Sequence, residues 1–290
     1  MKKGLMQCAL LTLFVFWVGV SNAWGEDGSK FLLLSSTIGP IDSGIVSVLE
    51  DRFEKETGIR VRHVGAGTGA ALKIAQQGSV DLAMVHAKKL EEEFIAKGFG
   101  TERYPLMYND FVIVGPAADP AGIKGMKTAA EALTAISAKG APFISRGDKS
   151  GTHVAEMDLW GKADTKPTGD WYVIYEKGAL GNAPTLKYAN EKNAYTVIDR
   201  ATYLSLKKEI HLVVCVEGDE AMLNYISLIP VSPKKFPAVH YKDTMTFVKW
   251  LTSPLKGQRI IESFGKETYG EPLFFPNSIE WQKTHNIKAK

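Results

Sequence analysis

The chain has 290 residues, of which 45% are apolar and 23% are charged, proportions typical of a soluble globular protein with one large or two moderate domains. Its formal net charge is only +3, and it falls further if residues 1–23, which contain two lysines, are removed. A nearly neutral domain of this kind is not expected to bind nucleic acid.

Residues 1–23 have the pattern of a secretory signal peptide. Two lysines precede an apolar run over residues 9–20, and Ser21 and Ala23 place small side chains at −3 and −1 of a cleavage site after Ala23. The run is short for a membrane anchor, and Cys8 precedes it, which disfavours a lipoprotein. We therefore expect a mature protein in the periplasm.

Cys215 is the only cysteine that remains after this cleavage, so no disulfide can form within the mature chain. It lies in an apolar run over residues 210–218. This setting predicts a buried structural thiol and disfavours a nucleophile.

Strand-like and helix-like segments alternate through the first hundred residues. Apolar side chains at helical spacing over residues 43–58 predict a helix that ends at Gly58. The pattern predicts strands at 30–37, 59–64 and 80–86, and helices at 43–58, 65–78 and 88–100. This order indicates a mostly parallel sheet with helices on both faces.

A β-rich run over residues 107–120 interrupts the alternation and ends in a turn rich in proline and glycine. A second set follows, with helices predicted at 128–140, 153–163, 184–191, 243–251 and 254–264 and from 199, and strands at 142–145, 194–198, 211–218 and 223–233. The two proline-terminated runs, near 110 and 230, are either strands that cross between two lobes or ordinary edge strands of one domain.

Three turns share one composition: residues 35–44, 65–69 and 145–152 each follow a predicted strand and open a predicted helix. The carboxyl ends of parallel strands lie along one edge, where ligands bind. Helix starts there present unpaired N–H groups and a partial positive charge, and hydroxyl groups add donors. The turns therefore predict an anion site, with plain helix capping by Ser43, Thr68 and Ser150 as the alternative.

Arg146 is the only arginine in these turns. Its guanidinium can form paired, charge-assisted hydrogen bonds to two oxygens of a tetrahedral anion. The alternative is a salt bridge to Asp148, and both hold if the aspartate orients an arginine that also binds the ligand.

Other motifs carry little chemistry. Residues 65–70 satisfy a G-x-G-x-x-A dinucleotide pattern, but they form the second strand-to-helix turn, and Lys88 stands where an acidic residue is expected. Ser150 and His153 are close in sequence without the G-x-S-x-G pattern, and no histidine pair has metal-ligand spacing. The sequence therefore predicts no cofactor, no direct metal ligands and no enzyme, with a secreted hydrolase using Ser150 and His153 as the rival.

Five segments together resemble the tungstate-binding proteins of bacterial ABC importers, over nearly all of the mature chain. They are residues 108–125, 145–153, 194–204, 216–231 and 264–277. The turn at 145–152 also resembles, more distantly, the oxyanion turn of phosphate-binding proteins.

The resemblance implies a type II periplasmic binding protein. This is an α/β fold of two lobes, each a mostly parallel sheet with flanking helices, joined by two crossing hinge strands. We expect lobe 1 to comprise residues 24–115 and 230–290, and lobe 2 to be inserted as residues 116–229. The lobes are expected to close around a dehydrated anion and to deliver it, as a monomer, to a membrane permease.

The resemblance also implies the ligand residues. The expected set comes from four loops and comprises Ser36, Thr37, Thr68, Gly69, Arg146, Ser150, Gly151, Thr152, Leu180 and Gly181. The first loop departs from the family pattern through residues 38–40, and the fourth, over residues 177–186, is also altered.

Tungstate is the expected ligand, and two other tetrahedral oxyanions remain as alternatives. Phosphate carries a proton at neutral pH and needs a buried acceptor, which Asp148 could supply. Molybdate has nearly the same charge and size as tungstate, so sequence reasoning does not separate the two.

Overall fold

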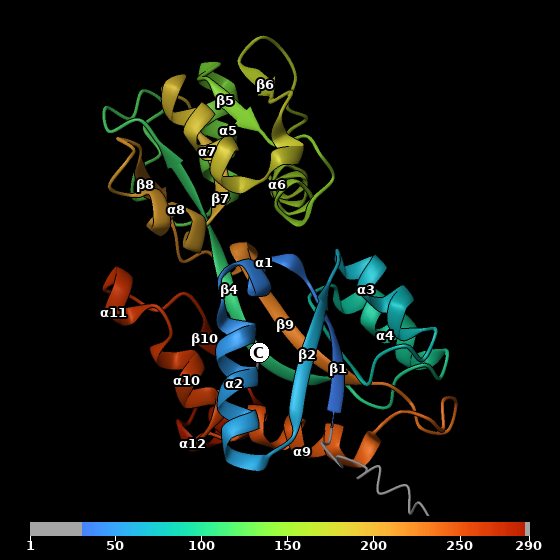
Figure 1. Ribbon diagram of the computed structural model, residues 1–290. Helices are drawn as coiled ribbons and strands as arrows, with labels where there is room; N and C mark the ends of the chain where they lie inside the picture. The colour runs from blue at the N-terminus through green and yellow to red at the C-terminus, as the bar shows by residue number, and fades with distance from the viewer. Residues whose placement is uncertain (1–30, 288–290) are drawn as a thin grey trace, which may run out of the picture.

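The computed structural model describes residues 31–287 as two bodies stacked end to end (Figure 1). We call the body built on strands β1 to β3 the first lobe and the body built on β5 to β8 the second lobe. The predicted signal peptide, residues 1–23, lies outside the described residues.

The first lobe centres on strand β1 (Phe31–Ser36), which pairs in parallel with β2 (Arg60–Gly65) and β3 (Leu82–Val85). The sheet then continues antiparallel from β3 through β9 (Leu223–Pro230) and β4 (Tyr104–Gly115). A short strand, Phe275–Pro276 (β10), closes the far edge on β4. The carboxyl ends of β1 and β2 point towards the second lobe (Figure 1).

Helices cover both faces of this sheet, as the alternating pattern predicts (Figure 1). They are α1 (Ile38–Asp42), α2 (Ile45–Thr57), α3 (Thr68–Ala75), α4 (Lys88–Ala96), α9 (Tyr241–Thr252), α10 (Gly257–Ser263), α11 (Lys266–Tyr269) and α12 (Ile279–Thr284). Helices α2, α9 and α10 share one apolar core with β1, and α3 and α4 share another with the opposite face.

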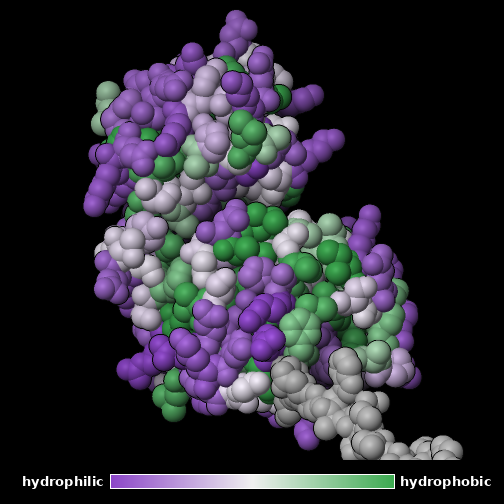
Figure 2. All heavy atoms as spheres, in the orientation of Figure 1, coloured by the Kyte–Doolittle hydropathy of each residue, from purple (hydrophilic) through white to green (hydrophobic). Residues whose placement is uncertain are grey.

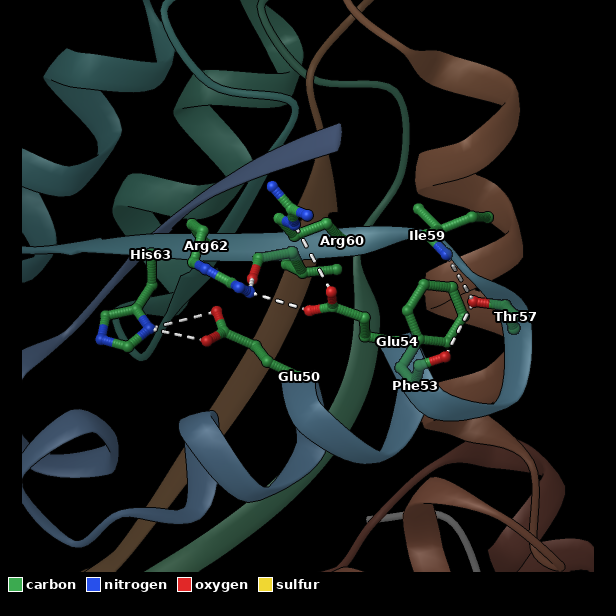
Figure 3. Close-up of polar contacts among 9 residues, drawn as sticks. Glu50, Phe53, Glu54, Thr57, Ile59, Arg60, Arg62 and His63 are labelled. Atoms are coloured by element: carbon green, nitrogen blue, oxygen red, sulfur yellow. Dashed lines mark hydrogen bonds and ion pairs between the residues drawn. The ribbon is translucent and has the colours of Figure 1, made fainter. Parts of the chain in front are cut away.

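Polar contacts fix α2 against the edge strand β2 (Figure 3). Gly58 ends the helix in the left-handed conformation, with φ of +71°. Glu54 accepts a hydrogen bond of 3.1 Å from Arg62, and the carboxylate of Glu50 lies 3.0 Å from Nδ1 of His63. Burial raises the pKa of Glu50, although the contact with His63 opposes the shift. These contacts hold α2 against the edge of the sheet.

Strand β4 changes partners along its length and so passes from one lobe to the other. Residues Tyr104–Asp110 pair with β9, and residues Phe111–Gly115 pair with β7 (Thr196–Asp199) and β8 (Val213–Val216). The change falls before residue 115, the boundary expected from the sequence.

The second lobe joins short strands to helices around Phe143, Trp160 and Tyr195, which are all fully buried. Phe143 and Trp160 meet edge to face with ring centroids 5.3 Å apart. Its remaining elements are α5 (Ala129–Lys139), β5 (Phe143–Ser145), α6 (Gly151–Lys162), β6 (Tyr172–Ile174), the 3-10 turn η1 (Gly178–Leu180), α7 (Asn182–Glu191), α8 (Arg200–Leu206) and the 3-10 turn η2 (Glu220–Met222).

Cys215 lies in this second core, as its apolar sequence setting predicts. The thiol is buried and unpaired, and burial raises its pKa to about 11, so it is a poor nucleophile at neutral pH. Among residues 31–287, no helix is both long and apolar enough to cross a membrane.

Candidate functional site

The turn after β5 places Arg146 between a buried strand and the start of α6. Gly147 and Lys149 both have positive φ, +65° and +61°. A Cβ atom on Gly147 would lie 2.2 Å from Cγ2 of Ile174, so this position requires glycine for space as well as conformation. The turn is thereby held against β6.

The guanidinium of Arg146 is held by three separate groups. Nε donates to the carbonyl oxygen of Gly178 at 3.2 Å, Nη2 donates to Oδ2 of Asp148 at 2.5 Å, and Nη1 donates to Oδ1 of Asn182. The expected salt bridge with Asp148 is therefore present. A guanidinium has five N–H donors, and these bonds use three of them.

Asp148 orients Arg146 from within the same turn. Its other oxygen, Oδ1, accepts a hydrogen bond of 3.1 Å from the backbone N–H of Ser150. Burial acts to raise the pKa of Asp148, but the hydrogen bonds from Ser150 and the charge of Arg146 outweigh it and lower that pKa. Asp148 is thus an ionised carboxylate at neutral pH.

The amino terminus of α6 lies directly after this turn. Ser150 caps the helix, because its hydroxyl accepts the N–H of His153 at 3.4 Å. The N–H groups of Gly151 and Thr152 fall in the first turn, where a helix has no partner for them. Two backbone donors therefore follow the Arg146 turn directly in the chain.

Ser150 and His153 do not form a nucleophile–base pair. The ring Nδ1 of His153 accepts the N–H of Lys149 at 2.9 Å, and the bond between the two residues is the helix cap. This arrangement gives no support to the hydrolase alternative.

The fourth expected loop reaches Arg146 through residues other than the two predicted. The side chain of Leu180 is 69% exposed. The N–H groups of Leu180 and Gly181 donate to Lys177 and Gly178 inside the turn, at 2.9 and 3.0 Å. Their role as ligand residues stays a prediction. Asn182, the next residue, contacts Arg146 directly and is not among the residues predicted from the sequence.

The first lobe contributes hydroxyl groups at the carboxyl edge of its sheet. Ser36 ends β1 and pairs with Gly65 of β2, which brings the loop before α3 close to Thr37. The hydroxyls of Thr37 and Thr68 are buried and have no hydrogen-bond partner within the described part of the chain, and the same is true of Ser35. Buried hydroxyls are normally paired, so these groups have unused hydrogen-bonding capacity at this edge of the sheet.

The remaining first-lobe residues are placed differently. The hydroxyl of Ser36 is buried and donates to the carbonyl of Thr37 at 3.3 Å. Gly69 lies in the first turn of α3, where its N–H has no partner within the helix. Thr68 makes no capping bond in this helix, so the capping alternative holds for Ser150 and not for Thr68.

His86 brings the two lobes into contact at this edge. It directly follows β3, whose Met84 carbonyl accepts the N–H of Thr37 at 3.2 Å. A Cβ atom on Gly151 would lie 3.4 Å from Cε1 of His86, so the imidazole meets the start of α6. Burial lowers the pKa of His86, against a hydrogen bond to Asn224, so the ring is neutral at pH 7.

His86 therefore places the start of α6 beside the first-lobe edge that carries Thr37. Sequence reasoning missed this contact, because a histidine after a buried strand has no local signature of a role across an interface. Within residues 31–287, no group of histidine, cysteine or acidic side chains is arranged to hold a metal ion.

Comparison with known proteins identifies the family. The sequence profile of the PBP superfamily domain matches residues 23–254. The chain belongs to the PBP superfamily. Over 251 residues it is 43% identical to the tungstate-binding protein TupA of Peptoclostridium acidaminophilum, and the match covers 86% of each protein.

Two solved structures agree with this assignment. One is the tungstate-binding protein TupA from Desulfovibrio alaskensis G20, with a TM-score of 0.80 and 42% identity, covering 86% of this chain and 99% of that one. The other is the tungstate ABC transporter protein from Geobacter sulfurreducens, with a TM-score of 0.70 and 46% identity, covering 81% and 99%. The resemblance and the two-lobe type II fold expected from the sequence are confirmed.

Proposed function

We propose that this chain is a periplasmic solute-binding protein that captures tungstate and delivers it to the membrane permease of an ABC importer. The observation that carries the proposal is the pair of buried, unpaired hydroxyls on Thr37 and Thr68, at the sheet edge that His86 joins to α6. The tungstate-binding relatives and the predicted leader at residues 1–23 support the same function and location.

The binding mechanism uses hydrogen bonds and no covalent chemistry, so the protein is not an enzyme. Thr37 and Thr68 supply hydroxyl donors, and the starts of α3 and α6 supply N–H groups with a partial positive charge. Arg146 supplies the full charge. Closing the lobes excludes water, which lowers the local dielectric constant and strengthens each of these bonds.

Asp148 favours a fully deprotonated anion over phosphate. Both of its oxygens already accept hydrogen bonds, from Arg146 and from the N–H of Ser150. A protonated phosphate would need one of the remaining lone pairs of Asp148 for its proton, whereas tungstate carries no proton to place. Molybdate remains indistinguishable by charge and size.

The division of the chain follows from the same function. We propose lobe 1 at residues 24–115 and 230–290 and lobe 2 at 116–229, with one change: β9 (Leu223–Pro230) pairs with β3 and β4 in the first-lobe sheet and is counted with lobe 1. We also propose that the protein acts as a monomer. Each lobe then contributes donors to one anion, and the crossing strands act as the hinge.

Isothermal titration of the mature protein with tungstate, molybdate, sulfate and phosphate tests the function. We expect tight binding of tungstate, and weaker binding of sulfate and phosphate. Arg146→Ala should weaken tungstate binding by about 100-fold or more, because two charge-assisted hydrogen bonds at about 1.5–3 kcal/mol each are lost. Arg146→Lys should lose less, because it keeps the charge.

Arg62→Ala is the matched control. Arg62 lies on the edge strand β2, and its side chain bonds to Glu54 of α2 and to the carbonyl of Val61 (Figure 3). It bonds to none of the proposed ligand residues, so its loss should leave the affinity unchanged. Wild-type affinity in Arg146→Ala would show that the site is misplaced. Absence of binding to all four anions would contradict the function itself.

A further inference from the structure

Asn182 makes three side-chain hydrogen bonds beside the proposed anion site, and the expected ligand set does not include it. It is the first residue of α7. Its Oδ1 accepts from Nη1 of Arg146 and, at 3.0 Å, from the hydroxyl of Thr152. A single amide oxygen thus contacts two of the residues that are expected to form the anion site.

The orientation of this amide is fixed by the chemistry of its neighbours. Nδ2 donates to Oδ2 of Asp199 at 2.6 Å, and a carboxylate can only accept. On the other side, the guanidinium of Arg146 can only donate. The amide therefore has one orientation that satisfies both partners, with Oδ1 towards Arg146.

Asp199 is itself immobilised. It caps α8, where Oδ1 accepts the N–H of Thr202 at 2.9 Å and Oδ2 accepts the hydroxyl of the same threonine at 2.6 Å. The amide of Asn182 is thus anchored to the start of another helix, and its position does not depend on the Arg146 turn. The amide of Asn182 can therefore hold the Arg146 turn in one place.

We propose that Asn182 is the positioning residue of the anion site, which sets the place of the Arg146 guanidinium. The hydroxyl of Thr152 donates to the same amide oxygen and helps to hold it. This inference rests on the proposed function. Asn182 does not itself touch the anion. With Gly178 and Asp148 on the other sides of the guanidinium, two of its five N–H groups remain for the anion.

A neutral amide suits this place better than a carboxylate. Asp148 already balances the charge of Arg146, and Asp199 lies directly behind Asn182. A further negative charge here would oppose the approach of a dianion. Asparagine supplies an acceptor for two donors and adds no charge.

The test is a double-mutant cycle measured by isothermal titration with sodium tungstate on the mature protein. Asn182→Ala should raise the dissociation constant by about tenfold or more, through misplacement of Arg146. In the Arg146→Ala background, the same substitution should raise it by less than about threefold, because the group it positions is gone. If Arg146→Ala binds too weakly to measure, Arg146→Lys serves as the background.

Asn190→Ala is the matched control on the same helix. Its Oδ1 accepts backbone N–H groups of His211 and Leu212, at 2.9 and 3.3 Å, and contacts nothing in the proposed site. Both asparagine variants should lower the melting temperature of the ligand-free protein, but only Asn182→Ala should change the tungstate affinity.

Two results would overturn the inference. One is an unchanged affinity in Asn182→Ala, and the other is an equal loss in the wild-type and Arg146 backgrounds, which indicates a purely structural role. Failure of the proposed function is distinguishable, because then the wild-type protein itself would not bind tungstate.

Discussion

At the scale of single residues, Glu156 is a buried carboxyl group beneath the Arg146 turn. It accepts hydrogen bonds from Ser145 at 2.8 Å, Tyr172 at 2.7 Å and the indole N–H of Trp160 at 3.2 Å. Burial raises its pKa to about 7, although these three donors act in the opposite direction. The strand that carries Arg146 is therefore packed on a group that titrates near neutrality.

This raised pKa makes stability depend on pH. The folded protein binds the Glu156 proton more tightly than the unfolded chain, so the stabilisation is fully present below pH 4.5 and is lost as pH rises through about 7. Glu156→Gln should remove a contribution of about 3 kcal/mol to this pH dependence. Glutamine can still accept from Tyr172 and Trp160 and donate to Ser145.

Urea denaturation of wild type and Glu156→Gln at about pH 5 and about pH 8 measures the effect. We expect the variant to gain stability relative to wild type at the higher pH. A difference between the two proteins that is the same at both pH values would contradict a raised pKa.

At the scale of elements, the turn between β5 and α6 depends on Gly147. Gly147→Ala should cost about 2 kcal/mol of unfolding free energy or more, because it adds a Cβ at positive φ and against Ile174. It should also weaken tungstate binding, since the backbone must move where Arg146 leaves the strand. Thermal denaturation and isothermal titration of the same sample measure both effects.

Gly161→Ala is the matched control within α6. A Cβ atom there meets nothing within 4 Å, so the substitution should be neutral or stabilise the helix by about 0.5–1 kcal/mol. Ile174→Ala combined with Gly147→Ala should recover part of the loss by removing the clash. Gly147→Ala with wild-type stability and affinity would show that this turn is not constrained.

Several elements follow directly from local sequence patterns. Helix α2 is predicted because Ile45, Leu49 and Phe53 recur at helical spacing before Gly58. Asp199 is predicted as a helix cap, and the structure confirms it. Helix α1 was expected as a turn, because Gly39 and Pro40 interrupt any longer pattern.

Local sequence patterns predict only part of the candidate site. The strand, turn and helix around Arg146 have local signals in glycine, serine and charge. The contact between Arg146 and Asn182 joins residues 36 positions apart, and no local pattern reports it. Strand β6 was also missed, because its Val173 and Ile174 are exposed and give no alternation.

At the scale of the whole molecule, Arg200 ties the lobes together where β4 changes partners. It makes a paired contact with Asp110 of β4, with a shortest distance of 2.6 Å, and further contacts with Glu217 at 2.8 Å and Glu271 at 3.3 Å. Hydrogen bonding to Asp110, ahead of Glu217, raises the pKa of Arg200. Glu271 belongs to the first lobe and Arg200 to the second, so the cluster spans the hinge (Figure 1).

Asp110 and Glu271 are the partners of Arg200 on the side of the first lobe. Substitutions of these two residues should differ in their effect on the free energy of unfolding. Asp110 is almost fully buried, so Asp110→Asn should cost about 3 kcal/mol, because it breaks a buried ion pair. Glu271→Gln should cost less than about 1 kcal/mol, because this carboxylate is partly exposed and screened by solvent. Urea denaturation of both variants provides the comparison, and equal losses would contradict this ranking.

The surface of the two lobes is polar over most of the outer face, with apolar side chains gathered on the first lobe where it faces the second (Figure 2). Ile38 and Val64, which flank the Thr37 loop, are among the exposed apolar residues. Closing the lobes would bury such side chains and exclude water from the anion. We therefore expect capture of the ligand to be accompanied by a movement of the lobes about β4 and β9.

The most direct measurement is a crystal structure of the mature protein with tungstate, with the metal located by its anomalous scattering. The account predicts one dominant peak between the lobes, with tungstate oxygens within about 3.2 Å of Arg146, the first N–H groups of α6, and the hydroxyls of Thr37 and Thr68. A dominant peak at any other place on the protein would contradict it.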